Sequence, residues 1–149
     1  MAESGQKLCG VFRQVSEFLK VGMRELDLAA GFEFRLRTAG NEGYVRMRAF
    51  NQELFQGLAL AATAGHPGFF DGAVTGRGLS TASPHGASTE IVAADTPVFL
   101  DYTGVFNGYI VDMTRIFVIG SLSAELIHAF KTALAIQKSL VDDLKPGAV

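Results

Sequence analysis

Apolar residues recur every three or four positions in three parts of the chain, a spacing that predicts three amphipathic helices. The first helix ends at Gly22, and its apolar face comprises Leu8, Val11, Phe12, Val15, Phe18 and Leu19. The second extends from Arg24 to Thr38, with acidic residues in its first turn and Gly40 after its end. The third begins at about Ser123, a favourable N-cap residue, and continues to Leu144.

Other segments are rich in β-branched and aromatic residues and predict strands. Val98 to Val105 and Tyr109 to Ile119 are two such runs, and the Asn-Gly pair between them favours a tight turn. Tyr44 to Ala49 alternates weakly and predicts a further strand, whereas Leu54 to Ala62 is compatible with a strand or a buried helix. We therefore expect the α+β class, an antiparallel sheet with helices packed on one face.

The segment from Gly65 to Ser88 is rich in Gly, Pro, Ser and Thr and predicts a loop. Loops of this length without secondary structure are uncommon unless they have a function. His85 lies in this loop, directly after Pro84.

Two carboxylates, Asp101 and Asp112, lie within the two longest apolar strands. If the turn is Phe106-Asn107, they are directly opposite, and if it is Asn107-Gly108, they are diagonal neighbours. Both registers place them on one face of the sheet, whereas a three-residue turn would separate them. Because buried carboxylates are costly without a positive partner, the pair predicts a bound cation. The alternative is that one of the two faces solvent and only the other is buried.

Composition narrows the classes of function. The chain has 149 residues, 48% hydrophobic and 19% charged, which fits one globular domain. Its net charge of −2 and the lack of a basic block give no indication of nucleic-acid or membrane binding. No apolar run approaches the roughly 18 residues that a membrane span needs. Cys9 is the only cysteine, which excludes an intrachain disulfide and favours a reducing, cytoplasmic setting.

A short sequence echo links the ends of the first and last helices. Phe18 to Met23 and Asp143 to Ala148 share the pattern Leu-Lys-x-Gly. The echo is compatible with a common helix-stop signal or with an internal duplication. The chain also ends just after Pro146-Gly147, a turn signal that normally leads into another element. We therefore expect residues 1–149 to be the first half of a longer domain.

The segment around the two aspartates resembles the pita-bread metallopeptidase family, which includes methionine aminopeptidase, prolidase, Xaa-Pro aminopeptidase and creatinase. The residues that match the family's hairpin are Asp101, Gly108, Tyr109, Asp112, Thr114 and Arg115. Lys20 to Gly40 and Pro84-His85 are also similar to the family, so the resemblance covers about residues 10 to 149. It implies that the chain is the amino-terminal half of a pita-bread catalytic domain.

The resemblance implies a role for each site residue. Asp101 would bind one ion of a two-metal centre, and Asp112 would bridge both ions. His85 would face the substrate and steady its carbonyl oxygen or the tetrahedral intermediate. Thr114 and Arg115 would hold the carboxylates in orientation. The metals implied are Mn²⁺, Co²⁺, Fe²⁺ or Zn²⁺.

The activity implied is that of a metal-dependent aminopeptidase or Xaa-Pro peptidase that hydrolyses the N-terminal bond of a peptide substrate. The family's remaining ligands, a His and two Glu, belong to the second half of the domain. We therefore expect the 149-residue chain alone to bind metal weakly and to hydrolyse little peptide. The alternative is a catalytically inactive half-domain that acts as a binding or dimerisation module.

Several positions depart from the family pattern, and we expect them to make the surroundings of the site more apolar: Thr96-Pro97, Thr103, Ile110-Val111 and Ile116. A half-domain would also leave a sheet edge and an apolar helix surface uncovered, and such surfaces drive association. We therefore expect a homo-oligomer.

Overall fold

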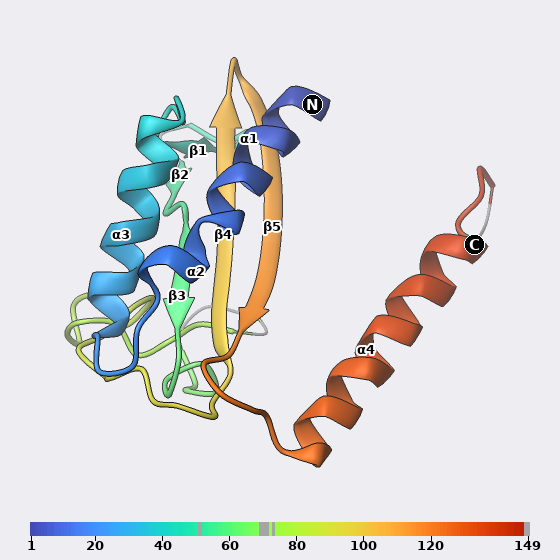
Figure 1. Ribbon diagram of the computed structural model, residues 1–149. Coiled ribbons are helices and arrows are strands. Elements are labelled where there is room, and N and C mark those ends of the chain that lie inside the picture. Colours follow the sequence, from blue (N-terminus) through green and yellow to red (C-terminus); the bar gives the residue numbers. More distant parts are fainter. Residues whose placement is uncertain (51, 69–71, 73, 148–149) are drawn as a thin grey trace.

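An antiparallel three-stranded sheet organises the protein, as seen in a computed structural model that describes residues 1–50, 52–68, 72 and 74–147. Its strands lie in the order β3-β4-β5 (Figure 1). Their bounds are Gly57–Leu60 for β3, Val98–Phe106 for β4 and Tyr109–Phe117 for β5. A separate pair, β1 (Val45–Arg46) and β2 (Glu53–Leu54), forms a short hairpin. The sheet confirms the expected antiparallel class.

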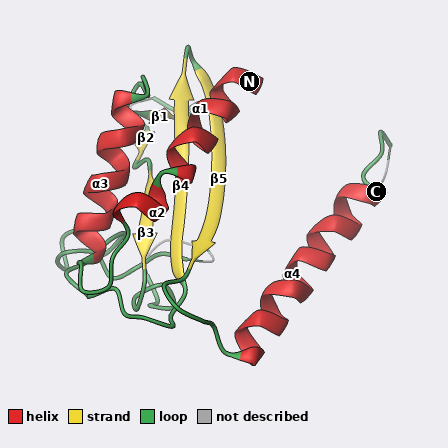
Figure 2. Cartoon of the chain, viewed as in Figure 1, coloured by secondary structure: helices red, strands yellow, loops and turns green. Residues whose placement is uncertain are grey.

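Helices cover one face of this sheet (Figure 2). They are α1 (Ala2–Arg13), α2 (Val15–Phe18) and α3 (Glu25–Thr38). Helix α1 packs across β4 and β5, and α3 packs along β3. The first predicted helix is thus interrupted at Gln14, whereas α3 has almost the predicted bounds.

The hydrophobic core lies between the helices and the sheet because the burial of β4 alternates over its first six residues. Val98, Leu100 and Tyr102 are fully buried on the helix side, whereas the residues between them are only half-buried. The Phe32 ring stacks on Tyr102 with centroids 4.3 Å apart and meets Phe12 edge-on at 4.8 Å. These contacts fix α1 and α3 against β4 and leave the opposite face of the sheet for other groups.

The turn between β4 and β5 sets the pairing of the two strands. Asn107 and Gly108 both have positive φ, 50° and 74°, as the two central residues of a type I′ turn require. The pairing Phe106↔Tyr109 follows, and it places Asp101 opposite Thr114 and Thr103 opposite Asp112. The Asn107-Gly108 register is therefore the correct one of the two that the sequence allows.

The weaker strand predictions are met in part. The segment Tyr44 to Ala49 contributes only β1, which is two residues long. Leu54 to Ala62 is a strand rather than a helix, because β3 lies within it and pairs with β4. The described residues between Gly65 and Ser88 form no helix and no extended strand, as expected of a loop.

Helix α4 (Ala124–Asp143) extends away from the sheet (Figure 1). Ser123 caps it as predicted, since its Oγ accepts a hydrogen bond of 3.3 Å from the Leu126 backbone N–H. None of its residues is buried, and its exposed apolar side chains are Leu126, Ile127, Phe130, Leu134, Ile136, Leu140 and Val141. No helix in the described part of the chain is both long and apolar enough to cross a lipid bilayer.

We expect the isolated chain to self-associate through α4, because an exposed apolar helix face of this size favours burial against a partner. Sedimentation velocity at tens of micromolar should show a dimer or a larger species. Replacing Phe130 and Leu134 with Asp should shift the chain toward monomer, whereas Thr132→Asp, on the polar face, should not. A monomeric wild-type chain at that concentration would contradict this expectation.

Candidate metal centre

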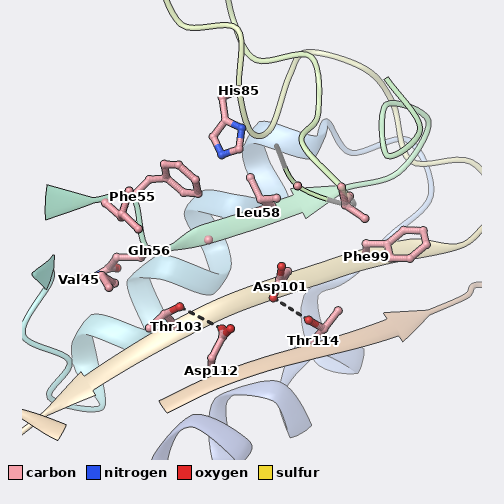
Figure 3. Close-up of a pocket in the computed structure, with 14 residues that line it drawn as sticks. Val45, Phe55, Gln56, Leu58, His85, Phe99, Asp101, Thr103, Asp112 and Thr114 are labelled. Atoms are coloured by element: carbon pink, nitrogen blue, oxygen red, sulfur yellow. Dashed lines mark hydrogen bonds between the residues drawn. The ribbon is translucent and has the colours of Figure 1, made fainter. Parts of the chain in front are cut away.

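A cavity of about 370 Å³ opens on the face of the sheet that the helices leave uncovered. Its polar lining comprises Gln56, His85 and four residues of the β4–β5 hairpin: Asp101, Thr103, Asp112 and Thr114 (Figure 3). Its walls are apolar, with Val45, Leu54, Phe55, Leu58, Val74 and Phe99. The hairpin thus places both predicted ligands in one apolar-walled cavity.

Each carboxylate is held by a threonine of the opposite strand (Figure 3). Thr114 Oγ1 donates to Asp101 Oδ1 at 2.7 Å, and Thr103 Oγ1 donates to Asp112 Oδ1 at 3.0 Å. The Met113 backbone N–H donates to the same Asp112 oxygen at 3.0 Å. In the described part of the chain, the Oδ2 atoms of the two aspartates accept no hydrogen bond. One oxygen of each carboxylate is therefore left to bind a further group.

The aspartates are less buried than their apolar strands suggested. Asp101 is half-buried, but Asp112 is exposed. This exposure is the alternative that the sequence left open, in which one of the two aspartates faces solvent. The reason is that β5 is the last strand of its sheet in the described part of the chain. Solvent screens exposed charges, so burial contributes little to cation binding here. The shared face and the unbonded Oδ2 atoms are the features that favour a bound cation.

The residues fit part of a metal centre. Two carboxylate oxygens on one face suit a divalent cation. Asp101 and Asp112 are diagonal neighbours on the two strands, and such neighbours lie roughly 7–8 Å apart, a span that two ions can occupy. Within the described residues, neither aspartate forms an ion pair with Lys or Arg, and no group of three or more His, Cys, Asp or Glu side chains could hold a metal. Two carboxylates alone leave such a centre open, so further ligands are needed to close it.

His85 lines the same cavity from the loop before β4 (Figure 3). Its imidazole is half-buried and packs against the Phe55 ring, with centroids 3.9 Å apart and an angle of 54° between the rings. Burial lowers the pKa of His85 below its usual 6.5, because desolvation disfavours the charged form. The imidazole is therefore neutral at pH 7 and can act as a hydrogen-bond donor or acceptor in the cavity.

Arg115 is not brought to the cavity. Strand side chains alternate between the two faces of a sheet. The side chain of Arg115 therefore projects from the face opposite to that of Asp112 and Thr114. Its Nη1 donates to the Thr114 carbonyl oxygen at 2.7 Å and contacts neither carboxylate in the described structure. Any influence of Arg115 on Asp101 is indirect, through the backbone of Thr114.

Thr103 is a site residue that its sequence context did not reveal. We expected this departure from the family pattern to make the surroundings more apolar, which is wrong at this position, because its hydroxyl binds Asp112. The register of the hairpin is the signal that could have found it, since the Asn107-Gly108 turn places Thr103 directly opposite Asp112.

The family model for metallopeptidase family M24 matches residues 1–149, and the chain belongs to this family. Of the curated proteins, an uncharacterized peptidase of Bacillus subtilis, YqhT, is 26% identical over 137 residues. That match covers 91% of this chain but only 32% of the relative. The chain thus spans about a third of the length of this relative.

Solved structures share the fold. The Xaa-Pro dipeptidase from Bacillus anthracis superimposes with a TM-score of 0.69 and 24% identity, covering 96% of this chain and 34% of its own. The prolidase from Pyrococcus horikoshii superimposes with a TM-score of 0.68 and 21% identity, covering 96% of this chain and 34% of its own. The X-Pro aminopeptidase from Thermotoga maritima superimposes with a TM-score of 0.66 and 21% identity, covering 89% of this chain and 31% of its own. These likenesses confirm the pita-bread architecture. This chain matches about a third of the length of each of these solved chains.

The close approach of β3 to the hairpin predicts a large effect of substitution at Gly57. A Cβ at this position would collide with the Asp101 carbonyl oxygen and lie 2.7 Å from Tyr102 Cα. Gly57→Ala should therefore lower the free energy of unfolding by roughly 1–3 kcal/mol, measured by urea denaturation. Gly10→Ala is the matched control, because that helical glycine has open space around it and alanine should stabilise by about 0.5–1 kcal/mol. Equal stabilities of the two variants would contradict the packing described.

Proposed function

We propose that the protein is a metal-dependent aminopeptidase or Xaa-Pro peptidase and that this chain supplies one side of its catalytic centre. One observation carries the proposal: Asp101 and Asp112 lie on one face, each held by a cross-strand threonine and each with one oxygen that accepts no hydrogen bond from the described residues. Membership of a metallopeptidase family supports the same chemistry.

The residues of the cavity have distinct proposed roles. Asp101 and Asp112 hold the divalent metal, and Thr114 and Thr103 orient the two carboxylates. Metal bound there would polarise the scissile carbonyl group and lower the pKa of a water molecule. His85, neutral at pH 7, donates a hydrogen bond to the carbonyl oxygen of the substrate and so favours the charge that develops on it.

A peptide with proline in the second position is the proposed substrate class. The apolar walls around the carboxylates, which include Phe55 and Phe99, suit the compact apolar ring of proline. Two of the similar structures are described as acting on X-Pro or Xaa-Pro bonds, which supports this choice. The proposed metal is Mn²⁺, Co²⁺, Fe²⁺ or Zn²⁺, each of which can bind carboxylate oxygen atoms.

The second candidate is a binding or dimerisation module. The exposed apolar side chains of α4 and of Ile110 and Ile116 on β5 favour it, because they fit a partner surface. The threonine contacts favour the enzyme, since a module without chemistry has no need of two oriented carboxylates. For either function we propose a homo-oligomer, and the single thiol of Cys9 supports a reducing, cytoplasmic setting.

Divalent metal should bind the isolated chain weakly and at the hairpin. Titration with Mn²⁺ should broaden the NMR signals of residues around Asp101 and Asp112 first, and the combined variant D101N/D112N should abolish this effect. Thr114→Val should weaken binding by about 10–100-fold, because it removes the donor that orients Asp101. Thr132→Val on α4 is the control. Broadening that is indifferent to both aspartates would contradict the assignment.

The protein encoded by the complete reading frame should cleave a dipeptide of the Xaa-Pro type faster than the same peptide with alanine in place of proline. Removing metal with a chelator should abolish cleavage, and Asp112→Asn should lower kcat at least about 100-fold. The 149-residue chain alone should show little activity. Metal-independent cleavage, or full activity of D112N, would rule out the proposed mechanism, and no cleavage of any peptide would favour the binding module.

A further inference from the structure

We propose that Glu25 is a positioning residue that fixes the place of His85 at the wall of the cavity. The inference rests on the proposed function in that it gives His85 a role toward substrate. Glu25 is the first residue of α3, and nothing in the mechanism above uses it. Its side chain is nevertheless fully buried and charged, which requires an explanation.

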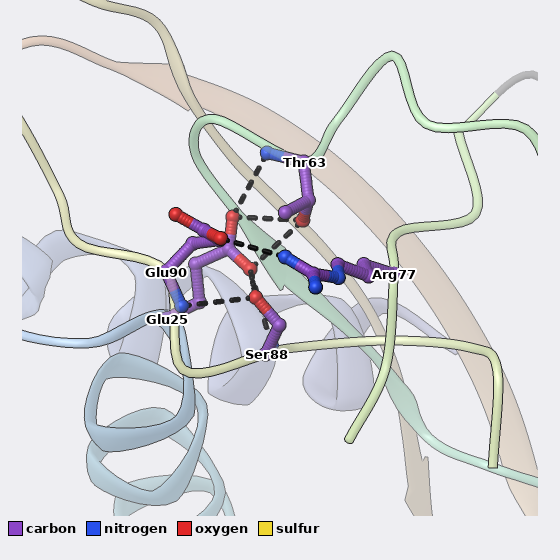
Figure 4. Close-up of polar contacts among 5 residues, drawn as sticks. All are labelled: Glu25, Thr63, Arg77, Ser88 and Glu90. Carbon is purple, nitrogen blue, oxygen red and sulfur yellow. Dashed lines mark hydrogen bonds and ion pairs between the residues drawn. The ribbon is translucent and has the colours of Figure 1, made fainter. Parts of the chain in front are cut away.

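Five donor groups surround the Glu25 carboxylate, and Figure 4 shows those of Thr63 and Ser88. At the end of β3, the backbone N–H groups of Ala61 and Thr63 donate to Oε1 at 2.7 and 3.2 Å. The Thr63 hydroxyl lies 2.8 Å from both oxygens. Ser88 donates to Oε2 from its backbone N–H at 3.1 Å and from its hydroxyl at 2.7 Å. Hydrogen bonds to a carboxylate are strong, and this set compensates for the burial of the charge.

The same carboxylate joins the β3 end to the segment that follows His85. Ser88 is three residues from His85, and its carbonyl oxygen accepts a bond of 3.0 Å from the Leu26 backbone N–H. The Glu25 backbone N–H donates to the Glu90 carbonyl oxygen at 2.9 Å. The segment from Ser88 to Glu90 is therefore fastened to the first turn of α3 by both backbone and side chain.

A second set of contacts holds Gly86, the residue directly after His85. The Gly86 N–H donates to the Thr75 carbonyl oxygen at 2.8 Å, and the Gly78 N–H donates to the Gly86 carbonyl oxygen at 2.9 Å. Gly76 and Gly78 have φ values of 74° and 69°, and a Cβ on Gly78 would collide with the Ser83 carbonyl oxygen and the His85 backbone N–H. Arg77, between these glycines, forms an ion pair of 2.7 Å with Glu90 (Figure 4).

His85 is thus followed by two anchored residues, Gly86 and Ser88, and the anchor at Ser88 depends on one carboxylate. A glutamine at position 25 would turn an NH₂ group toward donors that now bind an oxygen, so at least one of the two sets of bonds, to Ser88 or to the β3 end, would be lost. The Ser88 segment would then be free to shift, and the imidazole would shift with it, away from Phe55.

The test follows the His85 imidazole by NMR in the metal-free chain, so that it does not depend on activity or on metal binding. The aromatic signals of His85 report the neighbouring Phe55 ring, and its titration reports burial. Glu25→Gln should move these signals toward those of a solvated imidazole and raise the His85 pKa toward about 6.5. Glu17→Gln, an exposed glutamate of α2, is the matched control and should change neither.

Thr63 provides a second variant in case Glu25→Gln does not fold. In the described part of the chain, its hydroxyl binds Glu25 but no residue of the segment 83–88, so removing the hydroxyl acts first on the carboxylate. Thr63→Val, which has the same shape without the donor, should shift the His85 signals in the same direction, and Thr63→Ser, which keeps the donor, should restore them.

Folded variants E25Q and T63V with unchanged His85 signals would overturn the proposal. So would shifts spread equally over the β4 and β5 amides, because these would indicate a general loss of stability instead of positioning. If His85 responds as expected while Mn²⁺ shows no preference for the hairpin, the positioning is confirmed and the metal assignment fails. The two results therefore remain separate.

Discussion

The pairing of β4 with β5 is the constraint on which the rest of the structure depends. The side chains of a strand alternate with a period of two, so a shift of one residue would turn Leu100 and Tyr102 outward and Asp101 into the core. The type I′ turn at Asn107-Gly108 prevents that shift, because its length and its two positive φ values fix the register. The packing of α1 and α3 on one face and the pair of aspartates on the other are two consequences of one turn.

The sequence was most informative where a local rule decides the outcome. The Asn-Gly turn, the alternation of β4 and the Ser123 cap of α4 are interactions between near neighbours, and each is confirmed. The choice between two hairpin registers could not be made, because both turns have two residues and both keep the aspartates on one face. The structure chooses the register in which Gly108 takes the second positive φ.

Long-range contacts were out of reach of such rules. The Glu25 carboxylate binds partners that are 36, 38 and 63 residues away, and no periodicity links these positions. In the sequence Glu25 resembles any acidic residue in the first turn of a helix. The exposure of Asp112 was left open as an alternative for a related reason, since an apolar strand has the same pattern whether or not another strand covers its outer edge.

Three carboxylates of this chain show how hydrogen bonding separates structural from chemical roles. Glu25 has both oxygens saturated by protein donors and nothing left for a ligand, so it can act only on the parts of the chain that it holds together. Asp101 and Asp112 are each held through one oxygen, which fixes their direction while the second oxygen stays open toward the cavity.

In the proposed metal centre, this half-satisfied state would prepare the hairpin for a cation without completing its coordination. A threonine hydroxyl on Oδ1 reduces the rotational freedom that each carboxylate would lose on binding a cation, so the pair is pre-organised. Two such groups still leave most coordination positions of a divalent ion to other ligands. The chain spans about a third of the length of its relatives. A centre with one prepared side and an open cavity is what a site shared between this hairpin and further ligands requires. His85 lines the same cavity and is held by a separate set of contacts, so its proposed role is toward substrate rather than as a ligand.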